Sequence, residues 1–126
     1  MSTPGPIAYA RADLAAALKA ATTLPVHVNM PERLEPPCIV ITEGSPLLEQ
    51  GDCFGAVVIR LDANVVAAPV DNDLAIARLD AAVDEIAAAL LHDWTIKVEA
   101  YQAVGAADSQ RYLAARLTAT STLTIS

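Results

Sequence analysis

The stretch Asp71–Leu91, DNDLAIARLDAAVDEIAAALL, constrains the fold most, because it combines a helix start, an apolar stripe and an acidic back. Its large apolar residues recur at steps of three and four, the spacing of one helix face. They are Ile76, Leu79, Val83, Ile86 and Leu90. Asp71 is the expected N-cap, because its carboxylate accepts from free amides of the first turn. A helix with one apolar stripe needs a surface to cover, so the stretch predicts a sheet beneath it.

The segment Ala56–Val66 is the clearest strand, because its side chains alternate in character. One face is apolar throughout, and the other places Arg60 and Asp62 between valines. This second face is too polar for a core and too apolar for an open surface. A half-solvated face and a face covered by a neighbouring chain are both compatible with it, and we favour the second. The predicted subunit interface contains Val58, Arg60, Asp62, Asn64, Val66 and, from the last strand, Arg116.

The remaining elements follow from apolar periodicity and from the positions of proline and glycine. We expect a helix at Ile7–Ala21 and strands at Val26–Val28, Cys38–Thr42, Thr95–Tyr101 and Tyr112–Ile125. Pro31–Pro37 is an extended connector, and Glu43–Cys53 and Gln102–Arg111 are loops.

The order α-β-β-β-α-β-β predicts an α+β two-layer sandwich. The expected sheet is mixed but mostly antiparallel, has both helices on one face, and begins with a meander of three strands. Residues 1–126 form one domain, with residues 1–6 as a flexible N-terminal arm.

The charge balance argues against a nucleic-acid-binding protein. Fifteen acidic residues oppose eight basic ones, which gives a net charge of −7. Gripping a phosphate backbone requires clustered Lys and Arg. Apolar runs also fall well short of the roughly 20 residues of a membrane span. We therefore expect neither nucleic-acid binding nor membrane association.

The sequence contains no recognisable catalytic, cofactor or metal motif, so we predict that the protein is not an enzyme. Asp80 and Asp84 have a spacing compatible with a divalent ion, but a solvated acidic face is the favoured interpretation. Cys38 opens an apolar run and is expected to be buried, whereas Cys53 follows a polar loop. We expect no disulfide between them and no bound metal.

Four features in order give the chain its family resemblance: VHVNMPERLEPPCIVITEGSPLLEQGDCFG, the strand AVVIRLDANVV, the helix begun by DND, and a Thr-rich final strand. Together they resemble the tail terminator proteins of long-tailed phages (siphophages), also called tail completion or minor tail proteins, especially those of phages that infect actinobacteria. The resemblance covers nearly the whole chain.

The resemblance implies a structural virion protein at the head-proximal end of the tail, assembled in the host cytoplasm. Such a subunit joins a homo-oligomer, a hexameric ring, which caps the tail tube, ends its polymerisation and provides the head-attachment surface. Its partners would be the major tail tube protein and a neck or connector protein, and DNA would pass through the ring without specific binding. The loops expected to contact tube or neck supply Glu43, Leu47, Leu48, Glu49, Asp52, Asp108 and Arg111.

Two other functions stay open on the sequence alone. One is a phage head-completion or neck protein, the nearest competitor within the same class. The other is a small dimeric ligand-binding module, with a ligand between helix and sheet. The second requires a pocket lined by aromatic and polar groups, and the chain has only one Trp, one Phe and three Tyr.

Overall fold

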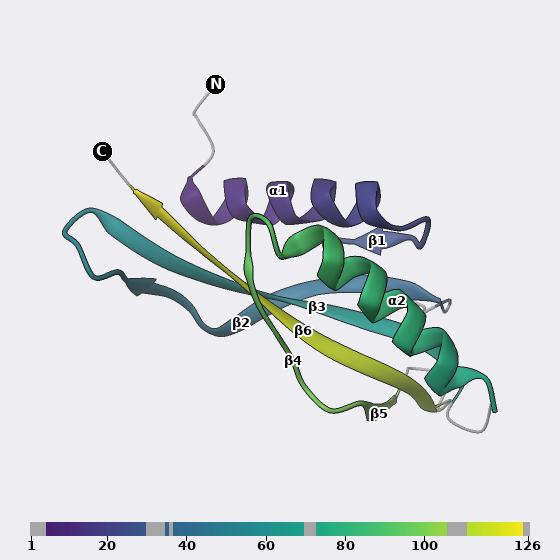
Figure 1. The fold of residues 1–126 in the computed structure, drawn as a ribbon. Coiled ribbons are helices and arrows are strands. Elements are labelled where there is room, and N and C mark those ends of the chain that lie inside the picture. The colour runs from purple at the N-terminus through teal and green to yellow at the C-terminus, as the bar shows by residue number, and fades with distance from the viewer. Residues whose placement is uncertain (1–4, 30–34, 36, 70–72, 106–110, 125–126) are drawn as a thin grey trace.

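The described residues form one sheet and two helices, and both helices cover the same face of the sheet (Figure 1). The structure is a computed structural model, which describes residues 5–29, 35, 37–69, 73–105 and 111–124. The elements are α1 (Pro6–Ala21), β1 (Val26–His27), β2 (Cys38–Gln50), β3 (Ala56–Pro69), α2 (Ala75–Leu90), β4 (Thr95–Val98), β5 (Gln102–Gly105) and β6 (Arg111–Thr124). The predicted α+β class, the mixed sheet and the single helical layer are confirmed.

The sheet is built around β3 and β6, which pair over nearly their whole length. Its order is β1-β2-β3-β6-β4, and β5 pairs with β6 beyond the end of β4. All pairs are antiparallel except β1 with β2, which is parallel. The predicted opening meander is therefore wrong at its first strand. A parallel neighbour cannot be joined by a tight turn, and the chain between β1 and β2 includes the proline-rich segment.

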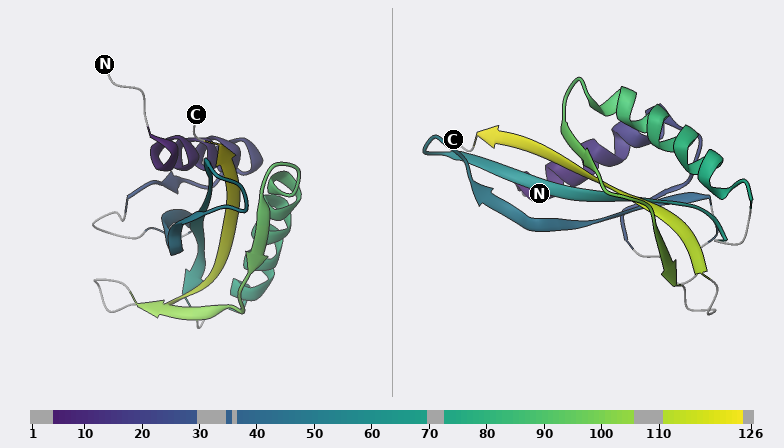
Figure 2. Two further views of the ribbon diagram at one scale, coloured as in Figure 1. Left: turned by 90° about the vertical axis from the view of Figure 1, so that its left-hand side faces the viewer. Right: turned by 60° about the horizontal axis from the view of Figure 1, so that its bottom comes forward.

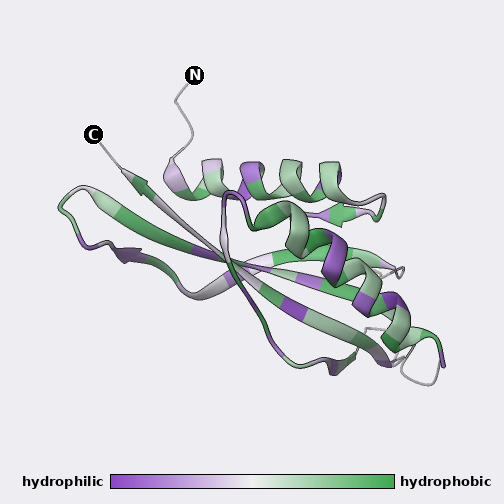
Figure 3. Cartoon of the chain, in the orientation of Figure 1, coloured by the Kyte–Doolittle hydropathy of each residue, from purple (hydrophilic) through white to green (hydrophobic). Residues whose placement is uncertain are grey.

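The main core lies between the helices and the sheet. In α1, Leu14 and Leu18 are four residues apart and fully buried, so they share the inner face of that helix. They meet Leu79 and Ile86 of α2 and the helix-facing residues of β3 and β6. Trp94, at the corner between α2 and β4, is 6% exposed. Figure 3 shows the resulting alternation of apolar and polar positions along β3 and β6.

Helix α2 begins at Ala75, later than predicted. Its N-cap is Leu74, which makes no side-chain capping bond, and Asp71 lies outside the described residues. Ile76 is 61% exposed, whereas Ala75 is 2% exposed. Each helical step turns the side chain by about 100°, so Ala75 takes the inner position and Ile76 points away. The predicted Asp71 cap and the place of Ile76 in the stripe are therefore wrong.

The predicted loop Glu43–Cys53 is mostly strand, because β2 continues to Gln50. Glu43 pairs with Leu61 and Leu48 pairs with Ile59, so four residues of β2 lie opposite Arg60 alone. The peptide bond between Ser45 and Pro46 within this bulge is cis. A Cβ added to Gly44 would lie 2.7 Å from the Cβ and the carbonyl oxygen of Arg60. The glycine and proline therefore mark a bulge inside a strand and not its end.

The predicted strand Thr95–Tyr101 is interrupted, and the predicted loop after it contains β5. Val98 pairs with Leu117 and Gln102 with Ala114, so three residues of the outer edge lie opposite two of β6. This bulge turns Tyr101 towards the helices, where its hydroxyl donates to Asp80 Oδ1 at 2.5 Å. Strict alternation along the predicted strand Thr95–Tyr101 would turn Tyr101 outward. This expectation is wrong, because the alternation breaks at the bulge.

A three-stranded ribbon extends past both helices (Figures 1 and 2). It consists of residues 48–50 of β2, 56–59 of β3 and 121–124 of β6, joined at its end by the turn Gly51–Gly55. β4 first pairs at Thr120, so it does not reach the ribbon. Gly55 has a φ of 85°, a conformation that suits glycine at a tight turn. Phe54 lies in this turn and is 97% exposed.

Candidate subunit interface

The face of the sheet turned away from the helices carries a network of polar side chains, which we call the polar face. Register places Asp62 opposite Thr118, Asn64 opposite Arg116, and Lys97 of β4 beside Thr118. The polar face consists of Arg60, Asp62, Asn64, Lys97, Arg116, Thr118 and Thr120. Its members come from the three adjacent strands β3, β6 and β4, whose alternation turns these residues to one side.

Asp62 is the centre of the polar face and is only 9% exposed. Its Oδ1 accepts a hydrogen bond from the Thr118 hydroxyl at 2.8 Å, and its Oδ2 lies 3.8 Å from Nε of Arg116. Hydrogen-bond and charge partners of this kind offset the cost of burying a carboxyl group. Because Arg116 is 58% exposed along its side chain, the guanidinium remains available to a second acceptor from outside.

Arg60 lies beside Asp62 and binds Glu49 across the bulge of β2. Its Nη2 donates to Glu49 Oε1 at 3.2 Å. Its Nη1 is shielded from solvent and has no hydrogen-bond partner among the described residues. A guanidinium has five N–H donors, so this side chain has bonding capacity that the single chain does not use.

Asn64 has a structural role within its own chain. Its Nδ2 donates to the Val40 carbonyl at 3.0 Å and to the Thr42 hydroxyl at 2.9 Å. These bonds fasten β3 to β2 on the polar face. Asn64 therefore stabilises the surface on which Arg60 and Arg116 are presented, and its amide donors are already used.

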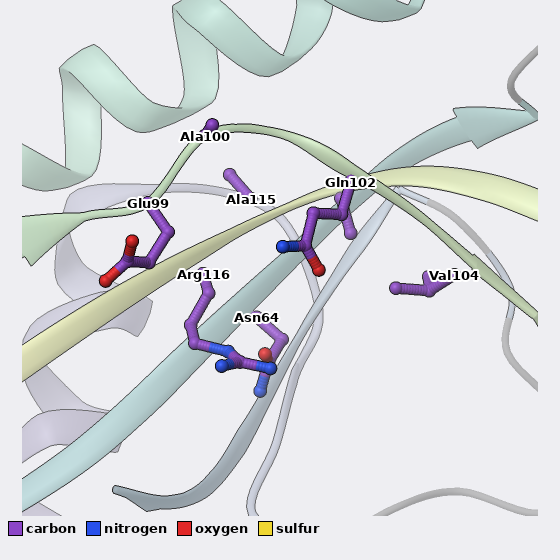
Figure 4. Close-up of a pocket in the computed structure, with 8 residues that line it drawn as sticks. Asn64, Glu99, Ala100, Gln102, Val104, Ala115 and Arg116 are labelled. Carbon is purple, nitrogen blue, oxygen red and sulfur yellow. The ribbon is translucent and has the colours of Figure 1, made fainter. Parts of the chain in front are cut away.

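A hollow of about 280 Å³ opens on the polar face. Its lining is almost wholly polar: Ser45, Arg60, Asp62, Lys97, Glu99, Arg116, Thr118 and Thr120. A smaller hollow of about 40 Å³ adjoins it and shares Glu99 and Arg116. Figure 4 shows the smaller hollow, with Glu99 and Gln102 on the outer edge of the sheet and Arg116 and Asn64 on the strands beside it.

The charges of the polar face are balanced in pairs. Arg60 pairs with Glu49, Arg116 with Asp62, and Lys97 Nζ with Glu99 Oε1 at 3.3 Å. A locally neutral face on a chain of net charge −7 can approach another copy with less repulsion than the rest of the surface. Exposed pairs of this kind contribute little stability to the monomer, so their arrangement suits recognition better than folding.

Two of the predicted interface residues lie at the outer limits of the polar face. Val66 is 3% exposed and packs in a second small cluster with Cys38, Val40, Tyr112 and Ala114. This cluster covers Val66 within its own chain, so we leave it out of the proposed contact surface. Val58 lies on the same side of β3 but towards the ribbon, where it lines a separate hollow with Glu49 and Thr122. Arg116 lies at the centre of the polar face, because it is paired with Asn64 of β3.

The residues predicted to contact tube or neck do not lie together. Glu43 binds Arg11 of α1, with 3.6 Å between Oε1 and Nη2, and Leu47 packs against the main core. Leu48 is 42% exposed, and Asp52 is exposed in the ribbon turn. Arg111 begins β6 at the opposite end of that strand. Asp108 lies outside the described residues. The described residues among those predicted to contact tube or neck therefore lie on both faces and at both ends of the sheet.

Five lining residues were not predicted from the sequence: Ser45, Lys97, Glu99, Thr118 and Thr120. The two threonines alternate with apolar residues of the last strand, so the signal that places them on the same face as Arg116 was present in the sequence. Lys97 required knowledge that β4 pairs with β6, and Ser45 required the bulge of β2. Those pairings are properties of the folded sheet.

The described residues contain no group of three or more His, Cys, Asp or Glu side chains that could hold a metal ion. Both cysteines are free thiols, and Cys38 is buried as predicted, with its pKa raised by burial. No helix among the described residues is long and apolar enough to cross a membrane. The polar face offers ion pairs and hydrogen-bond donors for contact.

Comparison with protein-family models and with curated proteins finds no match for this sequence.

Proposed function

We propose that the protein is a structural subunit of a phage tail: a tail terminator that assembles into a hexameric ring. In this proposal the ring caps the tail tube, ends its polymerisation and receives the head through a neck protein. DNA passes through the ring without specific contacts. The resemblance of the sequence to tail terminator proteins indicates this class of protein. The ion pairs and the exposed guanidinium of the polar face support assembly with other copies.

The observation that carries the proposal is the hollow lined by Arg60, Asp62 and Arg116 on the face without helices. Its lining is polar and is held by strands. An inserted side chain of a neighbouring copy could bind the guanidinium of Arg116, whose side chain is 58% exposed. Rigid strands hold these groups in place, which limits the conformational entropy lost on binding.

The apolar hollow between helix and sheet does not favour the ligand-binding alternative. It is lined mainly by Ala, Val, Leu and Pro, with Arg78 as its polar member. A metabolite site requires several convergent polar groups that fix the orientation of the ligand. The terminator and the neck protein are therefore the functions to separate by experiment.

Electron microscopy of particles assembled without the protein separates these two functions. A terminator predicts overlong tail tubes, because nothing stops tube polymerisation. Tails of normal length detached from full heads would contradict the terminator and indicate a neck protein. A fixed dimer at high concentration that does not bind the tube protein would contradict the ring itself.

Charge reversal on the polar face tests the interface. Arg116→Glu places a second negative charge beside Asp62 and removes a cation that is 58% exposed, so it should weaken assembly more than it lowers the free energy of unfolding. Lys19→Glu makes the same charge change on exposed α1 and is the matched control. Light scattering gives the oligomer mass, and urea denaturation gives the stability. Equal assembly by both variants would show that the polar face is not the interface.

A further inference from the structure

The ribbon turn presents a large apolar side chain that the chain itself leaves almost entirely in water. Phe54 is the only phenylalanine and is 97% exposed. Single exposed apolar residues are common on protein surfaces and carry little meaning alone. Phe54 differs because the three-stranded ribbon carries it beyond both helices, and because the same chain contains an apolar hollow of suitable size.

This hollow lies between the sheet and α2, near the end of α1, and has a volume of about 240 Å³. It is lined by Leu24, Pro37, Val65, Ala67, Ala81 and Ala82. An apolar cavity of about 150 Å³ is large enough to bind benzene, so the hollow can accept a phenylalanine ring. The small alanine side chains of α2 leave the space that a larger residue would occupy.

Phe54 cannot reach the hollow of its own chain. It precedes β3, and Val65 lies nine strand residues beyond Ala56. At about 3.3 Å per residue this separation is about 30 Å along a straight strand. Figure 1 shows the ribbon turn and α2 at opposite ends of the sheet. If Phe54 fills a hollow of this kind, that hollow therefore belongs to a second copy.

Charge favours the same pairing. Asp52 is exposed in the ribbon turn, two residues before Phe54. Arg78 lies at the hollow and is exposed, and it forms no ion pair with the described residues. A ribbon turn that places Phe54 in the hollow brings the Asp52 carboxylate towards the Arg78 guanidinium. The contact thus combines an apolar anchor with a complementary charged rim, as well-packed interfaces do.

We infer that Phe54 of one copy inserts into the apolar hollow beneath α2 of the next copy. The two surfaces differ and lie at opposite ends of the chain, so the contact is heterologous, and successive copies form a ring when the rotation closes. That this contact closes a ring rests on the proposed function, which the inference deepens by naming the two surfaces that meet. It adds a contact that does not include the polar face.

Cysteine cross-linking tests the contact directly, because Cys53 adjoins Phe54 and is exposed, whereas Cys38 is buried. Ala81→Cys places a second thiol at the hollow. Mild oxidation should give a ladder of covalent oligomers on a non-reducing gel. Ala88→Cys, exposed on the same helix about 10 Å further on, is the matched control and should give only dimers through Cys53. Equal products from the two variants would overturn the inference.

A mixing experiment tests the direction of the contact. Phe54→Ser removes the anchor and keeps the hollow, while Ala81→Arg fills the hollow and keeps the anchor. Each variant alone should associate at least about tenfold more weakly than the wild type in sedimentation velocity. An equimolar mixture should form a heterodimer, because one intact anchor meets one intact hollow. Leu91→Ser, at a residue that is 63% exposed elsewhere, should leave association unchanged.

The outcomes distinguish this contact from the proposed function. Wild-type association that Phe54→Ser does not change, or a mixture that stays monomeric, overturns the contact and leaves the tail role standing. Tubes of normal length in particles without the protein overturn the tail role, while a specific Ala81→Cys ladder still supports the contact.

Discussion

The ionisation of a single partly buried side chain depends on its neighbours, and Tyr101 shows this dependence. Tyr101 donates to Asp80 of α2 at 2.5 Å, which ties the outer edge of the sheet to the helix above it. Desolvation, the hydrogen bond to Asp80 and the negative charges of Asp80 and Asp84 raise the pKa of Tyr101 to about 12. The neutral phenol is the form that the folded state favours.

This pKa predicts a loss of stability in alkali. Because the folded-state pKa of about 12 lies above the ordinary value of 10.0, the contribution of Tyr101 is complete below about pH 10. It is lost as the pH rises through about 12. An absorbance titration of the folded protein should show a tyrosine that ionises near pH 12, and Tyr101→Phe should remove that step. An unchanged step near pH 12 in the variant would contradict the assignment.

Two residues of helix α2 show that burial depends on the position of a side chain around the helix and not only on its hydrophobicity. Leu79 is fully buried and Ile76 is 61% exposed, although both are large aliphatic residues in the same helix. Leu79→Ala should lower the free energy of unfolding by about 2–5 kcal/mol, because it leaves a cavity under α2. Ile76→Ala should change it by no more than about 0.5 kcal/mol. Urea denaturation of both variants measures the difference, and similar losses would contradict the described helix orientation.

The bulge of β2 provides a second prediction at this scale. Gly44→Ala places a Cβ 2.7 Å from the backbone of Arg60, so strand β2 must shift to accommodate it. We expect a loss of about 1–3 kcal/mol in the free energy of unfolding. The control is Gly5→Ala, where the added methyl meets no atom within 4 Å and only a small change is expected. Equal stability of the two variants in thermal melts would mean that β2 and β3 do not approach so closely.

The elements also show which parts of the fold could be predicted from the sequence. Alternation along Ala56–Val66 was sufficient to separate the core face of β3 from the polar face, because a strand has a fixed period of two. The bulges at Gly44 and at Tyr101 could not be predicted in this way. They change which side chains face inward, and they depend on how many residues the neighbouring strand offers at that point. Part of the lining of the polar hollow was missed for the same reason.

For the whole molecule, net charge and local charge have opposite consequences for assembly. Each chain has a net charge of −7, so copies repel one another at long range, while the ion pairs of the polar face nearly cancel there. Raising the ionic strength from about 0.01 to 0.15 M shortens the screening length from about 30 to about 8 Å. Self-association should therefore become stronger over this range in sedimentation experiments. Weaker association with added salt would indicate that attractive ion pairs dominate the contact.

The ribbon has a further consequence for how the chain opens. Neither helix extends over its end, so breaking the β3–β6 pairs at residues 56–59 exposes less apolar surface than breaking those beneath α2. Local opening there requires a smaller free energy than global unfolding. The backbone amides of the ribbon should therefore exchange with deuterium well before those of Leu61 and Leu117. Docking onto another copy would slow this exchange, so amide protection in the ribbon would report assembly at the level of single peptide groups.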